Sequence, residues 1–278
     1  MTHPPLSASN ARLRELRKLS RRSVRAERRL FLADGPKAVE GALGLAGCAV
    51  EVLATRHGLD HYADLVAEAE AADVAVTVVD DRAMGGLSDA VSPAGILAVC
   101  NHFPAERTPP APREEGLGLA RRGLVAICAD IRDPGNAGTV IRCADAAGAD
   151  LVIFAGDSVD PYNSKTVRAS VGSLFHLPIV IERDAQAAVR RAKEAGYLVL
   201  AADGGGEVDL YDADALLAKP TAWLFGNEAW GIPEDLKALA DHVVSIPIWG
   251  RAESLNLSTA AAICLYQSAR VQHTAANR

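Results

Sequence analysis

Apolar and polar positions alternate along the first hundred residues in a pattern that predicts a small α/β domain. An arginine-rich helix is expected near 10–28, with further helices at 36–46 and 60–72. Short runs such as AVEVLAT and VAVTVV separate these helices and predict strands, and the last of them is GILAVC at 95–100. Strands that alternate with helices over so short a stretch indicate one sheet covered by helices.

The second half of the chain has longer apolar runs, and a glycine-rich or polar turn follows several of them. Strands are expected at 123–128, 151–154, 197–201, 221–225 and 243–247, and helices at 136–147, 164–170, 184–194 and 256–270. This alternation predicts a parallel, doubly wound sheet, which binds ligands at the carboxyl ends of its strands.

Between the two halves lies a stretch rich in proline and charge, 102–116, which cannot continue a helix or a central strand. We therefore expect domains at 1–103 and 118–278, joined by a linker at 104–117.

Composition narrows the class of protein. Hydrophobic residues make up 49% of the 278 residues, which is ample for packed cores. No apolar run approaches the roughly 18 residues that span a bilayer, and the chain starts with polar residues, so we expect a cytoplasmic protein without a membrane partner. The five cysteines are odd in number and lack C-x-x-C spacing, which predicts reduced, buried thiols. We expect no catalytic metal.

Charge is distributed unevenly along the chain. Residues 1–37 hold ten Lys and Arg against three acidic residues, a net charge of +7, so the rest of the chain carries −13 of the total of −6. Such an asymmetry is typical of a local surface that binds a polyanion, although a solvated basic helix without any partner would have the same composition.

Three stretches combine glycine turns with short polar side chains, which is the character of a ligand site rather than a core. They are ADIRDPGNAGTVIRCADAAGAD at 129–150, WLFGNEAWGIPEDL at 223–236 and SIPIWGRAESLNLSTAAAIC at 245–264. Each follows or includes the end of an apolar run that is expected to form a buried strand. All three are therefore placed at the carboxyl edge of one sheet.

These blocks resemble the motifs of the SpoU (TrmH-type) RNA ribose 2′-O-methyltransferases of the SPOUT superfamily. The matching strings are N-x-G-x-x-x-R at 136–142, F-G-N-E at 225–228 and S-L-N-x-S at 254–258. The preceding segment resembles the L30e-like substrate-binding domain of that family. The resemblance implies a C-terminal SPOUT domain with a trefoil knot, S-adenosylmethionine as cofactor, and an RNA substrate. Because a separate N-terminal domain is present, ribosomal RNA, and large-subunit rRNA above all, is favoured over tRNA.

The resemblance also implies roles for individual residues. The candidate catalytic residues are Asn136, Arg142, Glu228, Ser254 and Asn256. The candidate cofactor-binding residues are Gly226, Asn227, Ile246, Ile248, Gly250 and Leu255, where Ile248 replaces the methionine of the family's I-P-M-x-G. The candidate RNA-binding residues are Lys165, Arg168, Arg21, Arg22 and Arg25.

Local structure offers simpler roles for some of these side chains. Asn136, Ser254 and Asn256 could each cap a helix, and Glu228 could be a surface carboxylate. Arg142 is harder to explain in this way, because a lone guanidinium in a helix of small and apolar residues needs an anionic partner.

Some other classes of protein would share these sequence features, and others lack their own motifs here. A tRNA ribose methyltransferase, or a catalytically silent RNA-binding protein of the same fold, would share most of these features. A dinucleotide-binding enzyme lacks its glycine fingerprint here, and no G-x-S-x-G motif supports a hydrolase. We also expect a homodimer through the C-terminal domain, because the helix at 256–270 is apolar over more of its circumference than one core-facing stripe needs. A helix wholly buried in its own subunit is the alternative.

Overall fold

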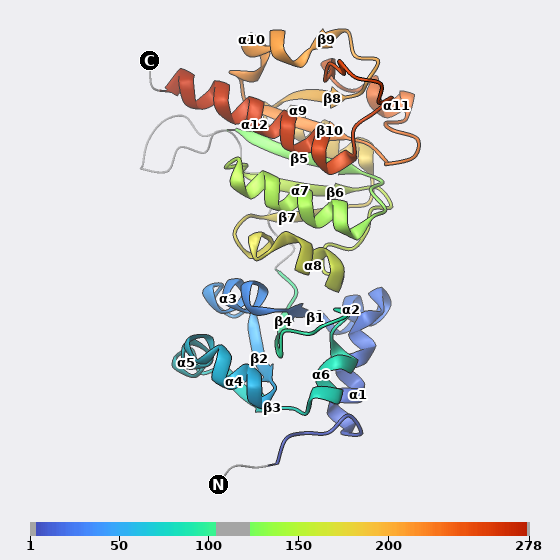
Figure 1. Ribbon diagram of the computed structural model, residues 1–278. Helices are drawn as coiled ribbons and strands as arrows, with labels where there is room; N and C mark the ends of the chain where they lie inside the picture. The colour runs from blue at the N-terminus through green and yellow to red at the C-terminus, as the bar shows by residue number, and fades with distance from the viewer. Residues whose placement is uncertain (1–3, 104–122, 277–278) are drawn as a thin grey trace. The chain divides into compact units, whose positions relative to one another are not determined.

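The computed structural model describes residues 4–103 and 123–276, and it divides into two compact units (Figure 1). Unit 1 comprises Met1–Pro104 and Asp160–His176, and unit 2 comprises Ala105–Val159 and Leu177–Arg278. The expected linker at 104–117 lies outside the described residues. Residues 160–176 therefore pack with the N-terminal unit, although in the sequence they lie among the SpoU-like blocks.

Unit 1 is built on a four-stranded sheet in the order β1-β4-β2-β3. The strands are β1 (Leu30–Asp34), β2 (Ala49–Ala54), β3 (Ala75–Val78) and β4 (Ile96–Asn101). The helices are α1 (Ala11–Arg17), η1 (Lys18–Ser20), α2 (Arg22–Arg28), α3 (Pro36–Gly44), α4 (Arg56–His61), α5 (Ala63–Ala71), α6 (Asp81–Leu87), α8 (Ser164–Ser170) and η2 (Ser173–Phe175). β4 runs antiparallel to β1 and β2, whereas β2 and β3 are parallel. Leucines from α1, β1, β2 and β4 share one hydrophobic core.

Two predicted helices are each divided in two. The helix expected at 10–28 breaks at Arg21, whose backbone is extended (φ −90°, ψ 129°). The helix expected at 60–72 is preceded by the separate helix α4, and the break falls at Tyr62 (φ −117°, ψ 40°). Periodicity does not locate the first break, because buried Leu13, Leu16 and Leu19 keep helical spacing up to it.

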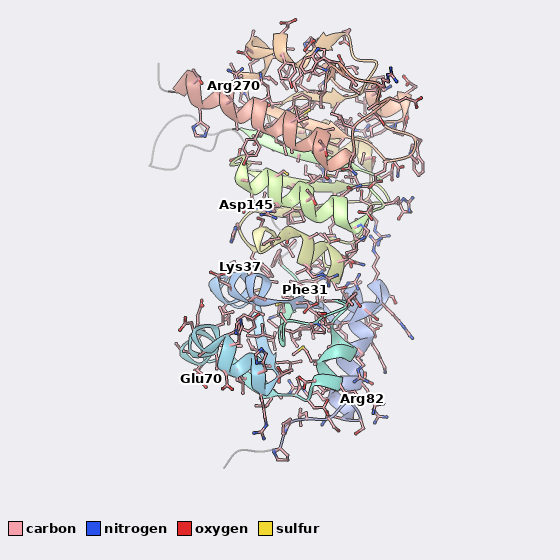
Figure 2. The ribbon with its side chains drawn as sticks, in the orientation of Figure 1. Phe31, Lys37, Glu70, Arg82, Asp145 and Arg270 are labelled. Atoms are coloured by element: carbon pink, nitrogen blue, oxygen red, sulfur yellow. The ribbon has the colours of Figure 1, made fainter. Side chains whose placement is uncertain are left out.

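The segment 160–176 is fixed to unit 1 by a buried ion pair and an aromatic cluster. Arg25 donates from Nε and Nη2 to Oδ2 of Asp160 at 2.8 and 2.6 Å, and both side chains are buried. The ring of Phe31, labelled in Figure 2, lies 4.8 Å from that of Tyr162 and 6.2 Å from that of Phe175. Helix α8 and η2 are consequently part of the core of unit 1.

Loss of Arg25 is expected to destabilise unit 1 strongly. Arg25→Leu leaves Asp160 as a buried, unpaired carboxylate, and breaking such a pair typically costs about 3–5 kcal/mol in the free energy of unfolding. Urea denaturation measures this loss. Arg28→Leu is the matched control, because Arg28 forms an ion pair with Glu15 at the surface and its removal is expected to have a slight effect. Equal losses in the two variants would contradict the structural role of Arg25.

Unit 2 contains a seven-stranded sheet in the order β7-β6-β5-β10-β8-β11-β9, and every neighbouring pair is parallel. The strands are β5 (Leu124–Ala129), β6 (Leu151–Ala155), β7 (Ile179–Glu182), β8 (Leu198–Ala202), β9 (Val208–Asp209), β10 (Thr221–Phe225) and β11 (His242–Ser245). The helices are α7 (Pro134–Ala146), α9 (Ala185–Glu194), η3 (Leu210–Asp212), α10 (Asp214–Leu217), α11 (Glu234–Lys237) and α12 (Leu257–Ala276). The predicted parallel sheet is confirmed, whereas the short, partly exposed edge strands β7 and β9 were not predicted.

Helices cover both faces of this sheet, as Figure 1 shows. Val125 and Ile127 of β5 pack in one cluster with Val189 of α9. On the other face, Trp223 of β10 donates from Nε1 to Oγ of Ser268 in α12 at 2.8 Å. Because both faces are buried, consecutive strand residues are apolar, and the site must lie at the strand ends.

Candidate active site

The three glycine-rich blocks meet at one cavity at the carboxyl ends of β5, β10 and β11. The cavity has a volume of about 480 Å³, within the range of small-molecule sites. Asn136 lines it from the first block, Gly226 to Ala229 from the second, and Ile246 to Asn256 in part from the third. Ala202, the last residue of β8, and the next two residues, Asp203 and Gly204, complete the rim. Stretches 120 residues apart in the sequence thus form one site within unit 2.

A hydrogen-bond network centred on Glu228 joins the blocks. Its Oε1 accepts from the backbone amide of Asp133 at 3.1 Å and from Nδ2 of Asn136 at 3.2 Å, and its Oε2 accepts from the amide of Arg132 at 3.1 Å. Asn256 donates from Nδ2 to Oδ1 of Asn136 at 3.1 Å. Glu228 and Asn256 therefore fix the orientation of Asn136 from two sides.

These contacts set the charge of Glu228. Burial acts to raise its pKa, but hydrogen bonds from the amides of Arg132, Glu228 itself and Asp133, and from Asn136, outweigh burial and leave the pKa below its usual range. Glu228 is thus an anion at neutral pH. Its contribution to stability is complete above the pKa of the unfolded chain and is lost as the pH falls through the lower folded-state pKa.

Two of the proposed capping roles can be compared with the structure. The N-cap of α7 is Asp133, whose Oδ1 accepts from the amide of Asn136 at 2.7 Å, so the interpretation of Asn136 as the cap is wrong. Asn256 does cap α12, because its Oδ1 accepts from the amides of Ser258 and Thr259 at 2.9 and 3.4 Å. Asn256 thus joins a helix end to the network, and the side chain of Asn136 is left to face the cavity.

Asp130 connects the first two blocks through an unusual backbone. Its φ of 55° is left-handed, a region that Asp and Asn tolerate better than most residues. The carbonyl of Asp130 accepts from Nδ2 of Asn227 at 2.6 Å, and its Oδ1 accepts from the amide of Asp157 at 2.7 Å. Asn227, which is buried and lines the cavity, is therefore held by the exit of β5.

Five of the six candidate cofactor residues line the cavity: Gly226, Asn227, Ile246, Ile248 and Leu255. Gly250 is exposed and is not among the lining residues. At Gly226 a Cβ would lie 2.3 Å from the carbonyl carbon of Gly231, so the turn itself requires glycine there. The close approach at Gly226 is therefore to the backbone of Gly231, another part of the same chain.

Of the five candidate catalytic residues, Asn136, Glu228, Ser254 and Asn256 line the cavity and Arg142 does not. Arg142 is on α7 and exposed, and it forms no hydrogen bond or ion pair with any residue the structure describes. It lies six residues after Asn136, or about 240° around a helix, so the two side chains leave α7 on different faces. The guanidinium expected to need an anionic partner has none within the described part of its own chain.

The candidate RNA-binding residues all belong to unit 1. Arg21, Arg22 and Lys165 are exposed. Arg168 is partly exposed and donates from Nη1 to Oδ2 of Asp34 at 3.3 Å. Arg25 was predicted to bind RNA, but it is 3% exposed and bonded to Asp160, so this assignment is wrong. A buried arginine cannot be told from an exposed one by charge pattern alone.

Comparisons with known proteins agree with this geometry. Residues 123–266 match the SpoU rRNA Methylase family, and residues 10–98 match the MRM3-like substrate binding domain. The chain belongs to the SpoU rRNA methylase family. One relative is the 23S rRNA (guanosine(2553)-2'-O)-methyltransferase RlmP of Bacillus subtilis (strain 168), which is 31% identical over 94% of this chain and 96% of its own length.

Solved structures of SpoU-type enzymes share the fold. The AdoMet-bound rRNA methyltransferase from Sinorhizobium meliloti superposes with a TM-score of 0.78 at 31% identity, covering 95% of this chain and 96% of that one. AviRb from Streptomyces viridochromogenes in complex with AdoMet has a TM-score of 0.80 at 29% identity, covering 95% and 100% of the two chains. The predicted SPOUT α/β fold with an N-terminal substrate-binding domain is confirmed. The trefoil knot stays a prediction.

The described residues can also be compared with the requirements of a metal site, a membrane-spanning helix and a disulfide. His57 and His61 form an H-x-x-x-H spacing on α4, and their ring centroids are 5.6 Å apart. Residues 4–103 and 123–276 contain no group of three or more side chains that could hold a metal ion. No helix within these ranges is long and apolar enough to cross a bilayer. The five cysteines are free, and all but Cys143 are buried.

Proposed function

We propose that this protein transfers a methyl group from S-adenosylmethionine to the 2′-hydroxyl of a ribose in ribosomal RNA. The observation that carries the proposal is the single cavity at which all three SpoU blocks meet, with Asn136, Glu228 and Asn256 in one network. RlmP and other relatives are named as 23S rRNA 2′-O-methyltransferases, which favours large-subunit rRNA as the substrate.

The cavity suits S-adenosylmethionine chemically. Apolar side chains of Phe225, Val244, Ile246 and Leu255 line it together with carboxylates and amides of Asp203, Glu228, Glu253 and Asn136. Such a lining can accept a heterocyclic ring on its apolar walls and a cationic, hydroxylated ligand on its polar ones. When bound, the cofactor supplies a methyl group that its sulfonium already activates.

The residues of the chain then have to align the ribose and manage its proton. Arg142 clamps the neighbouring phosphate, orients the 2′-hydroxyl and stabilises the charge that develops on its oxygen. A guanidinium with a pKa above about 12 is a poor proton acceptor at pH 7, so the proton leaves to phosphate or water. Glu228 holds Asn136 in place and takes no proton, because its hydrogen bonds keep its pKa low.

Alkaline digestion of the product tests the reaction. RNA methylated with radioactive S-adenosylmethionine is expected to yield a labelled, alkali-resistant dinucleotide, because a 2′-O-methyl group blocks cleavage of the adjoining phosphodiester. Label on a base, with no resistant dinucleotide, would reject the assignment. Use of purified rRNA and purified tRNA in parallel separates the favoured substrate from the alternative. A catalytically silent RNA-binding protein would leave both unlabelled.

The basic surface of unit 1 supplies RNA affinity in this proposal. Arg21→Gln should weaken RNA binding and reduce the slope of log K against log salt by about 0.7–0.9 if one phosphate contact is lost. Affinity measurements at several salt concentrations check this. Arg270→Gln removes the same charge from unit 2, where Arg270 is paired with Asp214, and should leave the slope unchanged. An unchanged slope in Arg21→Gln would remove Arg21 from the RNA surface.

Deletion of residues 1–105 is unsuitable for this purpose. It would remove Arg25 and Phe31 and so expose the inner faces of Asp160, Tyr162 and Phe175. Point substitutions at the surface of unit 1 leave that core intact.

We also propose that the protein works in the cytoplasm as a homodimer through unit 2. Leu257 and Ala260 on α12 line the cavity, but Ile263 is partly exposed and Tyr266 is 53% exposed outside it in a single chain. Arg142 lies outside the cavity of its own chain, so a second copy could bring its own Arg142 to that cavity. Both features support association of two chains.

A further inference from the structure

Two aromatic side chains of unit 2 are exposed and stacked on each other. Trp249, in the loop after β11, is 84% exposed, and Tyr211 of η3 is 46% exposed. Their ring centroids are 5.9 Å apart and the ring planes differ by 11°. Each ring therefore limits the rotation of the other, and one large indole is presented to solvent in a defined orientation.

This pair lies beside the candidate active site. Ile248, which precedes Trp249, lines the cavity and is 38% exposed, and Glu253 lines it from the other end of the same loop. Arg251, between them, is exposed and forms no hydrogen bond or ion pair with any residue in the described ranges. An aromatic ring and an arginine thus flank the cavity on a loop that also forms its wall.

We infer that Trp249 is a stacking site for an unpaired RNA base next to the nucleotide whose ribose enters the cavity. Tyr211 supports the indole, and Arg251 contributes a cation to the same loop. Base–aromatic stacking together with arginine is a general way of holding single-stranded nucleic acid. The inference rests on the proposed function, because it requires RNA at this cavity.

A base fits these features better than a phosphate or a second protein chain. Two exposed carboxylates are close to the rings in the sequence: Asp212 follows Tyr211, and Glu253 lies four residues after Trp249. The surface around the rings is therefore not strongly positive. Trp249, Tyr211 and Ile248 form a patch far smaller than the roughly 800 Å² per partner of a stable protein interface. Residues 250–254 around it are small, polar or charged and exposed. A flat neutral ring is the ligand that such an isolated pair can cover.

Fluorescence quenching tests this directly. The chain has three tryptophans, of which Trp223 is fully buried and Trp230 is 59% exposed. In Trp230→Phe, Trp249 is the remaining exposed indole. A short oligoadenylate is expected to quench it, whereas an abasic ribose-phosphate oligomer of equal length and charge is not. Equal quenching by both oligomers, or by neither, would overturn the inference.

Affinity measurements give a second readout. Trp249→Ala should weaken oligoadenylate binding about tenfold, by the same factor at low and high salt, and Trp249→Phe should stay within about threefold of wild type. Trp230→Ala is the matched control and should leave oligoadenylate affinity unchanged.

Three outcomes in Trp249→Ala would contradict the stacking role. The first is unchanged RNA affinity, and the second is weakened S-adenosylmethionine binding, which would place Trp249 in the cofactor site. The third is a change in the mass of the oligomer in solution, which would place Trp249 in a subunit interface. The alkali-resistant dinucleotide formed by the wild-type protein tests the proposed function separately, so the two can fail independently.

Discussion

Arg142→Ala is expected to slow methyl transfer about a hundredfold to a thousandfold while S-adenosylmethionine binds with unchanged affinity. Loss of one group that stabilises developing charge typically has a kinetic effect of this size. Because Arg142 does not line the cavity of its own chain, its removal should leave the cofactor walls intact. Single-turnover kinetics measure the rate, and calorimetry measures cofactor binding.

Controls separate charge from geometry at this position. Arg142→Lys keeps the charge but loses the planar, bidentate fork, so it should recover only a small part of the rate. Arg270→Ala removes an exposed arginine of α12 that is paired with Asp214 and should have no effect. Activity of Arg142→Ala within threefold of wild type would refute the role of Arg142.

Mixing of subunits extends this experiment to the proposed dimer. If Arg142 acts on the cavity of a second copy, mixed dimers of Arg142→Ala and Asn136→Ala chains should regain activity, because one of their two sites has both residues. If Arg142 acts within its own chain, the mixture stays as inactive as its components. If sedimentation gives a particle mass equal to that of one chain, the protein is a monomer and the proposed dimer is contradicted.

Glu228→Gln is the second change with a large expected effect, a loss of about a hundredfold in methyl transfer. The two carboxylate oxygens accept from the amides of Arg132 and Asp133 and from Asn136. A glutamine has one oxygen, so its amide nitrogen must face one of these donors, and the loop moves. Displacement of reacting groups by about 1 Å can cost this much in rate.

The matched control for Glu228→Gln is Glu234→Gln on α11, where the carboxylate is 89% exposed and paired with Lys237. It makes the same chemical change and should leave the rate unaltered. Weaker S-adenosylmethionine binding should accompany the loss in Glu228→Gln, because Gly226 and Asn227 belong to the same turn. In the wild-type protein, the stability that ionised Glu228 contributes should be lost as the pH falls through its folded-state pKa, which hydrogen bonds hold below the usual range. Wild-type rates in Glu228→Gln would contradict its positioning role.

The sequence predicts the sheet of unit 2 well because burial on both faces produces long apolar runs, such as LVAIC and AWLF, that need no tertiary information to recognise. It fails for β9, which has two partly buried residues and exists only because β11 lies beside it. The placement of Asp160 and Tyr162 in unit 1 also depends on distant partners, Arg25 and Phe31, and no local pattern indicates it.

The site is predicted in part for similar reasons. Glycine turns after strands indicate the cavity, but a charged residue in a pattern does not reveal its partner, as Arg25 demonstrates. One signal was present and missed: Asp133-Pro134 is a typical N-cap and first helical residue, which places Asn136 inside the helix. The exposure of Trp249 has no counterpart in the sequence, because the same IPIWG string would be compatible with a buried indole.

The residence of 160–176 in unit 1 bears on how such genes can recombine. A crossover in the stretch between the two halves of the sequence would join one parent's Arg25 and Phe31 to another parent's Asp160 and Tyr162. A chimaeric protein with an exchanged substrate-binding unit therefore has to inherit two separate stretches from the same parent. We expect the sequences of these two stretches to vary together among related proteins, so that a change of RNA preference requires both stretches to be exchanged.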